Sequence, residues 1–241
     1  MSDKNPYRIC TWDEKADCAD CDNQGILHCK WDAKVLTGFI IPAVTFCAIA
    51  IFGMVLTGII TGVWWPLIAY AGFWVFFFVF FEIRILCSHC PYYARSGRML
   101  RCLANHGMIK LWRYHPEPMS GFEKISLLIC FVIFGAGPVV WQAYGIWFLA
   151  LHYSAYGALP LLALSGIAGA SILGITAFFT VLMVFFCPRC VNFSCPLNRA
   201  GKDKVDAYLR RNKVMRDAWE KKGYRLGKED GKESQPKQKQ D

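Results

Sequence analysis

Charged residues are missing from two long stretches of this 241-residue chain. Residues 35–81 and 125–188 contain no Asp, Glu, Lys or Arg, which leaves 47 and 64 consecutive uncharged positions. Helices and strands of a water-soluble domain need a polar face, so runs of this length exclude such a domain. About 20 apolar residues cross a bilayer, and each run holds enough for two crossings. The sequence therefore predicts an all-α integral membrane protein.

Motifs that mark several enzyme and binding classes are also missing. Residues 1–32 are polar and have no apolar core of a signal peptide, so none is expected. The chain has no Walker sequence, dinucleotide fingerprint, Ser-His-Asp arrangement or HExxH. Of the five histidines only His152 lies in an uncharged run, which excludes a haem held by two histidines inside the membrane. No basic motif interleaved with aromatics occurs, so no nucleic-acid partner is expected.

Each uncharged run divides at its middle into a helical hairpin. The four transmembrane helices are predicted at residues 33–57, 62–86, 126–152 and 160–186, and the two hairpins at 33–86 and 126–186. Segments 1–32, 87–125 and 187–227 lie outside the membrane. Residues 202–223 have the pattern of an amphipathic helix that lies on the membrane surface or on a partner. Residues 228–241 are rich in Lys, Gln, Glu and Asp, and we expect them to be disordered.

Basic residues determine the expected orientation. All 27 Lys and Arg residues lie in the three segments outside the predicted helices and at the helix ends that adjoin them. The turns at 58–61 and 153–159 have none. Because loops rich in Lys and Arg stay in the cytoplasm, we expect a multi-pass protein of the inner (cytoplasmic) membrane with both termini in the cytoplasm.

Ten of the twelve cysteines lie in the segments predicted to be cytoplasmic. Cys47 and Cys130 fall within predicted helices, where a thiol packs like a small apolar residue. Disulfides are uncommon in the cytoplasm, so metal binding or redox chemistry is expected of the others. Four thiols with the spacing C-x7-C-x2-C-x7-C are sufficient for one metal ion or cluster. This first group consists of Cys10, Cys18, Cys21 and Cys29.

Two further cysteine groups resemble each other. Each begins with a C-x2-C sequence at the cytoplasmic end of the second helix of a hairpin, followed by an aromatic residue and a third cysteine. This repetition suggests an internal duplication and predicts that the two C-x2-C sequences converge at the membrane surface, where one or two further centres would form. The second group is Cys87, Cys90 and Cys102, with His106 as a further candidate ligand; the third is Cys187, Cys190 and Cys195.

The metal is left open by the spacing of the first group. It matches neither the two separated C-x2-C sequences of a zinc ribbon nor the C-x2-C-x2-C-x3-C-P sequence of bacterial ferredoxins. Proline follows Cys90, Cys187 and Cys195, which favours iron–sulfur clusters. Structural zinc sites use the same residue types at similar spacing, and free or redox-active thiols are the third alternative.

Two sets of polar residues near the ends of the predicted helices are weaker candidates. Glu82 and Arg84 either influence a nearby cluster or carry a proton, or they extend to the membrane surface as an ordinary helix-end pair. Gln142, His152 and Tyr153 either contribute to a quinone pocket near the outer face or make ordinary interfacial hydrogen bonds.

The sequence thus predicts an iron–sulfur protein that transfers electrons between a cytoplasmic redox partner and the membrane. The acceptor is the quinone pool or another subunit of a membrane complex. The alternative is a zinc-stabilised scaffold or assembly factor without redox activity, and an oxidoreductase subunit with a catalytic cluster or thiol is a third interpretation. The sequence has no substrate-binding motif that favours the last of these.

Overall fold

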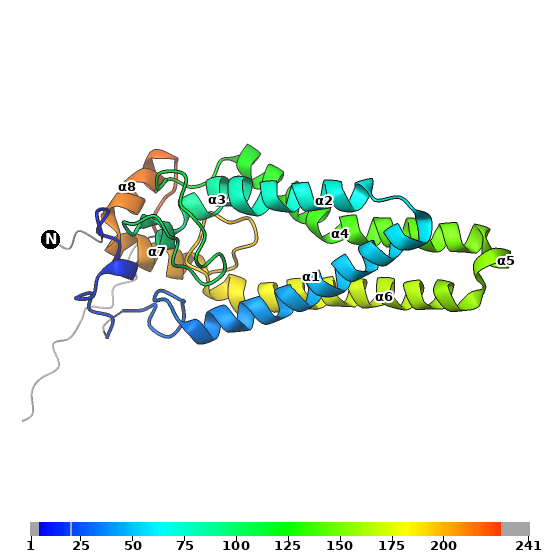
Figure 1. The fold of residues 1–241 in the computed structure, drawn as a ribbon. Coiled ribbons are helices and arrows are strands. Elements are labelled where there is room, and N and C mark those ends of the chain that lie inside the picture. Colours follow the sequence, from blue (N-terminus) through cyan, green and yellow to red (C-terminus); the bar gives the residue numbers. More distant parts are fainter. Residues whose placement is uncertain (1–4, 20, 228–241) are drawn as a thin grey trace, which may run out of the picture.

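The computed structural model describes residues 5–19 and 21–227. In this part of the chain every regular element is helical, and the one β-bridge, between Met99 and Ile109, belongs to no sheet. Four long helices lie side by side, and the segments outside them gather at one end of the bundle (Figure 1). The expected all-α fold with four helices long and apolar enough to cross a membrane is confirmed. The predicted disordered tail, 228–241, lies outside the described residues.

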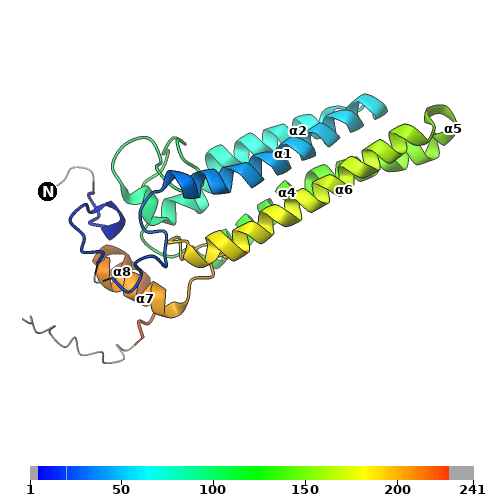
Figure 2. The same ribbon diagram turned by 90° about the horizontal axis from the view of Figure 1, so that it is seen from below.

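The four long helices form two hairpins. The first pairs α1 (Ala33–Thr61) with a composite helix made of α2 (Trp65–Val75), a π-helical segment (Phe76–Phe81) and α3 (Glu82–Ile85). The second pairs α4 (Gly121–Leu151) with α6 (Ala158–Val181), which continues as a π-helical segment (Leu182–Phe186). The short helix α5 (Tyr153–Tyr156) joins them at the far end of the bundle (Figure 2).

Three of the differences from the predicted helices have a local cause in the structure. Helix α1 runs through the predicted turn 58–61 and ends at Thr61, because Gly62 provides the left-handed residue that terminates it (φ 73°). Helix α4 begins five residues earlier, since Ser120 and Glu123 form a reciprocal capping box that accommodates charged residues in the first turn. The predicted helix 202–223 is two helices, α7 (Lys202–Arg211) and α8 (Lys213–Lys221), separated at Asn212.

Aromatic side chains and a few hydrogen bonds between helices hold the bundle together. Phe46 of α1, Phe134 of α4 and Phe178 of α6 form a buried cluster between these three helices. Gln142 of α4 donates to the Ala50 carbonyl (3.1 Å) and accepts from the Ser171 hydroxyl (3.1 Å), so one side chain joins α1, α4 and α6. Most of the apolar surface of the four helices faces outward, as contact with lipid requires.

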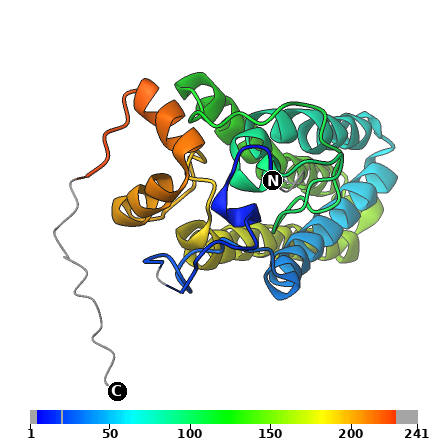
Figure 3. The same cartoon turned by 90° about the vertical axis from the view of Figure 1, so that its left-hand side faces the viewer.

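The three segments outside the bundle pack on one another. We call residues 5–32, 86–120 and 187–227, as far as they are described, the head. One apolar core includes Ile9 from the first segment, Tyr92 and Leu100 from the second, and Tyr208 and Trp219 from the third. Helices α7 and α8 cover one side of the head (Figure 3). Their apolar face, which we expected to lie on the membrane or a partner, is buried against the chain's own head.

Candidate metal centres

The two C-x2-C sequences at the ends of the hairpins have the same backbone conformation. A 3₁₀ turn forms Cys87–His89 in one and Cys187–Arg189 in the other, and each directly follows the end of a long helix. The fourth residue is extended in both, with φ/ψ of −83°/137° at Cys90 and −79°/133° at Cys190. Its N–H donates to the carbonyl of the first cysteine, over 2.9 Å and 3.5 Å respectively. The repetition seen in the sequence is therefore also present in the backbone.

The second and third cysteine groups lie next to each other. Burial raises the pKa of the Cys90 thiol well above its usual value, and the neighbouring Cys190 thiolate raises it further. Burial raises the pKa of Cys102 to about 12, with a further contribution from Cys190. The pKa of Cys195 is likewise raised to about 12, by burial and then by Cys190. Cys190 therefore lies within electrostatic range of both groups.

Backbone N–H groups are directed at the sulfurs of these two groups. The N–H of Ala104 donates to Cys102 Sγ (3.5 Å) and that of Asn192 to Cys190 Sγ (3.4 Å), in each case from the residue two positions after the cysteine. Hydrogen bonds from the backbone of Tyr92 and Leu197 act in the same way on Cys90 and Cys195. Such bonds stabilise a thiolate, the form in which cysteine binds a metal.

The first group forms a second concentration of thiols in the head. Burial raises the pKa of Cys29 to about 12, and the thiolates of Cys10, Cys21 and Cys18 each add to the shift. All four predicted members are thus within electrostatic range of Cys29. Lys30 lies beside them, and its ammonium group donates to the Cys10 carbonyl (3.0 Å).

Tyr92 connects the segments that carry the two concentrations of thiols. Its side chain is buried, and its hydroxyl donates to the His28 carbonyl next to Cys29 (2.9 Å). Burial raises the pKa of this hydroxyl, and thiolates of both concentrations add to the shift: Cys90, Cys190 and Cys102 from one, Cys29 from the other. The loop that follows Cys90 is therefore joined to the segment of the first group.

Asparagine side chains position the cysteine loops. This role of the asparagines is not among the features predicted from the sequence. Asn105 donates to Cys87 Sγ (3.3 Å), and Asn198 donates to the Cys190 carbonyl (2.8 Å). Asn192 donates to the Leu86 carbonyl (2.9 Å), which joins the third group to the start of the second. Each of these asparagines follows a cysteine by two or three residues, a spacing that is visible in the sequence.

The weaker candidates lie in different environments. Glu82 is buried, with Oε2 lacking a hydrogen-bond partner, and its charge acts on Cys102. Arg84 instead faces Glu123 (3.8 Å), so these two residues do not form the expected helix-end pair. His106 is exposed and its ring lies against Trp31 (centroid distance 5.2 Å); its described contacts include none with a cysteine. Gln142 is fully buried between helices and is not available to a quinone.

The ten thiols of the head are free, and none forms a disulfide. In the described part of the chain no three Cys, His, Asp or Glu side chains converge closely enough to hold a metal ion as they stand. The sulfurs would therefore have to move together on binding, and the raised pKa values mean that binding would release protons.

No known protein family matches this chain, and neither a curated protein nor a solved structure is significantly similar to it.

Proposed function

We propose that this protein transfers electrons between a cytoplasmic redox partner and the inner membrane. Iron–sulfur clusters held by the cysteines of the head would carry them. The first centre would use Cys10, Cys18, Cys21 and Cys29. The six thiols of the second and third groups would serve one or two further centres at the ends of the membrane helices. The electron donor would be a soluble cytoplasmic redox protein, and the acceptor a quinone or another subunit of a membrane complex.

The position of Tyr92 carries this proposal. A protein with one structural metal site needs no second thiol group close by, whereas electron transfer requires centres that are near one another. The first group lies in the head and the others begin at the last turn of the membrane helices, and Tyr92, two residues after Cys90, donates from its hydroxyl to the His28 carbonyl next to Cys29. The thiol groups are thus arranged in order from the aqueous side toward the membrane.

The residues around the thiols suit the proposed clusters. Iron–sulfur clusters are held by cysteine thiolates, and when bound they accept and release single electrons at a potential that hydrogen bonds to sulfur and burial adjust. The head supplies both conditions, through the N–H groups directed at Cys102 and Cys190 and through the low exposure of Cys87, Cys102 and Cys187.

The basic segments support the proposed orientation. Most of the chain's Lys and Arg residues lie in the head, and Lys34, Arg84 and Lys124 lie at the helix ends that adjoin it, while the opposite turns, at Gly62 and Gly157, have none nearby. By the positive-inside rule the head is cytoplasmic, where thiols stay reduced and free to bind metal.

The direct test is metal and acid-labile sulfide analysis of the full chain purified without oxygen, together with its absorption and EPR spectra. We expect iron and sulfide, and a colour that bleaches on reduction. Replacing both cysteines of either C-x2-C sequence by serine (Cys87 and Cys90, or Cys187 and Cys190) should remove part of the iron and most of the electron flux. Cys47→Ser combined with Cys130→Ser is the matched control, because these thiols lie in the bundle.

Two results would contradict the proposal. Full electron flux after loss of both C-x2-C sequences would show that these thiols carry no electrons. Colourless protein with zinc, at about one ion per four thiols as in closed structural sites, would instead support a zinc-stabilised membrane scaffold or assembly factor.

A further inference from the structure

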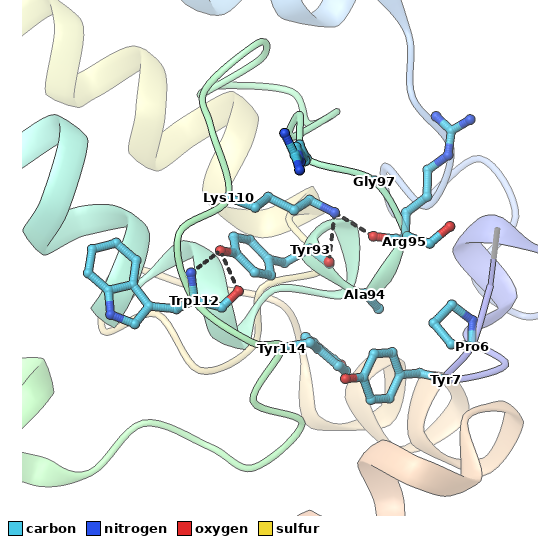
Figure 4. A pocket seen from close by; sticks show the side chains of 11 residues that line it. Pro6, Tyr7, Tyr93, Ala94, Arg95, Gly97, Lys110, Trp112 and Tyr114 are labelled. Atoms are coloured by element: carbon cyan, nitrogen blue, oxygen red, sulfur yellow. Dashed lines mark hydrogen bonds between the residues drawn. The ribbon is translucent and has the colours of Figure 1, made fainter. Parts of the chain in front are cut away.

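A cavity of about 290 Å³ opens in the head between the N-terminal segment and the loop that follows Cys90 (Figure 4). Pro6 and Tyr7 form one wall, and Tyr93, Trp112 and Tyr114 form the other. No cysteine lines it, so it is separate from the candidate metal centres. Its volume is close to the lower end of the range for small-molecule sites, which is about 300 Å³.

The charged side chains that line this cavity are all basic. Arg95, Arg98 and Lys110 contribute three positive charges, and no Asp or Glu is among the lining residues. None of the three forms an ion pair with a described residue. Like charges held close together repel one another, so an anion in the cavity would remove an unfavourable interaction.

Local structure holds the loop and the ammonium group of Lys110 in place. The Met99–Ile109 bridge and the bond from the Lys110 N–H to the Arg98 carbonyl (2.8 Å) pair the two arms of the loop. Gly97, with φ of 109°, permits the turn that precedes the first arm. The ammonium group of Lys110 donates to the carbonyls of Tyr93 (3.0 Å) and Arg95 (Figure 4). An ammonium group has three N–H donors, so one remains for a ligand.

Aromatic rings surround the basic groups. The ring of Tyr93 lies 5.1 Å from the Lys110 ammonium, and its hydroxyl is hydrogen-bonded to the Trp112 backbone (3.0 Å), which fixes both residues. The Tyr7 ring contacts the Tyr114 ring edge to face, with the ring centroids 4.9 Å apart. Fixed aromatic side chains next to basic groups are the combination that binds a planar ring joined to a phosphate.

We propose that this cavity binds a phosphate-bearing ligand with a planar ring, the size of a mononucleotide. The phosphate would lie beside Arg95, Arg98 and Lys110, and the ring against Tyr7. This inference goes beyond the proposed electron transfer and does not depend on which metal the head binds. The site is also close to the thiols, because Cys90 lies within electrostatic range of Tyr114.

Binding is measured on the full chain in detergent, with flavin mononucleotide as a fluorescent probe. We expect saturable binding, competition by adenosine monophosphate, and much weaker binding of riboflavin, which lacks the phosphate. Arg98→Gln should weaken binding about tenfold or more, the usual effect of losing one charge-assisted hydrogen bond. Arg98 is exposed, so this change should leave the fold intact. Arg113→Gln, at an exposed position of the same loop outside the lining, is the matched control.

Five results would overturn the proposal. The first four are the absence of saturable binding, equal affinity for riboflavin and flavin mononucleotide, equal affinity for inorganic phosphate and flavin mononucleotide, and equal effects of Arg98→Gln and Arg113→Gln. The fifth is that the protein does not bind the flavin but binds anionic vesicles through Arg98, because the surface would then be a lipid contact. Iron and sulfide content of the same sample tests the electron-transfer proposal separately, since neither outcome predicts the other.

Discussion

The side chain of Asn212 holds Cys10 from a position 202 residues further along the chain. Its Oδ1 accepts from the Cys10 N–H (2.7 Å), and its Nδ2 donates to Cys10 Sγ (3.2 Å) and to the Tyr208 carbonyl (2.8 Å). Asn212 is fully buried at the break between α7 and α8. The break in the amphipathic segment therefore places an amide on the first cysteine group.

Replacing Asn212 by leucine should weaken the first group selectively. The change removes the N–H donor from the Cys10 sulfur and leaves the Cys10 N–H buried without a partner, which costs about 1–3 kcal/mol. We expect a lower melting temperature in detergent and loss or a shifted potential of one EPR signal. Asn105→Leu is the matched variant, because Asn105 donates to Cys87 instead. The two variants should affect different EPR signals. Identical effects of both would contradict separate roles of Asn212 at the first cysteine group and Asn105 at the second.

Gln142 gives a test of the membrane bundle that is independent of the head. Gln142→Leu removes its bonds to Ala50 and Ser171 between three helices. Hydrogen bonds between membrane helices contribute about 0.6 kcal/mol on average, so we expect a modest loss of stability. Ser171→Ala should lower the stability of the bundle less when Gln142 is already replaced by leucine than in the natural chain. Additive losses would show that the Ser171–Gln142 bond does not contribute.

Both hairpins could be predicted from the sequence because absence of charge over 47 and 64 residues has few structural explanations. The proximity of Cys90 and Cys190 could also be predicted, since both follow a membrane helix at the same distance. The charges of Glu123 and Lys124 favour a later start of α4, although the capping box of Ser120 and Glu123 is visible in the sequence.

Other features depend on long-range packing and are not encoded in any local pattern. The contact of Asn212 with Cys10 joins residues that are 202 positions apart in the chain. Likewise, the apolar positions of α7 and α8, such as Tyr208 and Trp219, fit a membrane surface as well as a protein core by pattern alone. Their burial against Ile9 and Leu100 becomes visible only when the three segments are placed together.

The orientation across the membrane is tested by fusions at two positions. A fluorescent protein that folds only in the cytoplasm, joined after Asp241, should be bright, and alkaline phosphatase at the same place should be inactive. The same phosphatase inserted next to Gly157, in the turn between α5 and α6, should be active. The opposite pattern would show that the protein has the inverse orientation, with its thiols in an oxidising compartment.

Hydrogen bonds to the Asp206 carboxylate join the segment after α8 to α7. Its carboxylate accepts from Lys202 (2.6 Å), the Tyr224 hydroxyl (2.8 Å) and the Gly227 N–H (2.9 Å). Burial would raise the pKa of Asp206, but these hydrogen bonds outweigh it and hold the pKa below its usual value. The stabilisation is therefore complete above the unfolded pKa of about 3.9 and is lost as pH falls through the lower, folded value.

Asp206→Asn should release this segment at neutral pH. We expect trypsin to cleave after Arg225 about tenfold faster, in proportion to the fraction of molecules with the segment open, for a loss of about 1.4 kcal/mol. Asp217→Asn is the control, because this carboxylate pairs with Lys213 along α8 and does not contact residues 224–227. Equal cleavage rates in the two variants would contradict the role assigned to Asp206.

The proposed phosphate site predicts a pH dependence that comes from Lys110. Burial and, to a smaller extent, the neighbouring Arg95 guanidinium lower the pKa of Lys110 to about 8. No carboxylate lines the cavity. A bound phosphate favours the charged ammonium form, so binding should weaken as pH rises through about 8 and Lys110 loses its proton.

Flavin mononucleotide affinity measured from pH 7 to 9.5 checks this prediction, since the phosphate, with its second pKa of about 6, stays doubly charged over this range. The dissociation constant should rise by at most about tenfold per pH unit, the limit for release of one proton. Lys110→Gln should bind less tightly near pH 7 and lose the pH dependence, whereas Arg113→Gln should keep it. An affinity independent of pH in the natural chain would mean that Lys110 does not contact the phosphate.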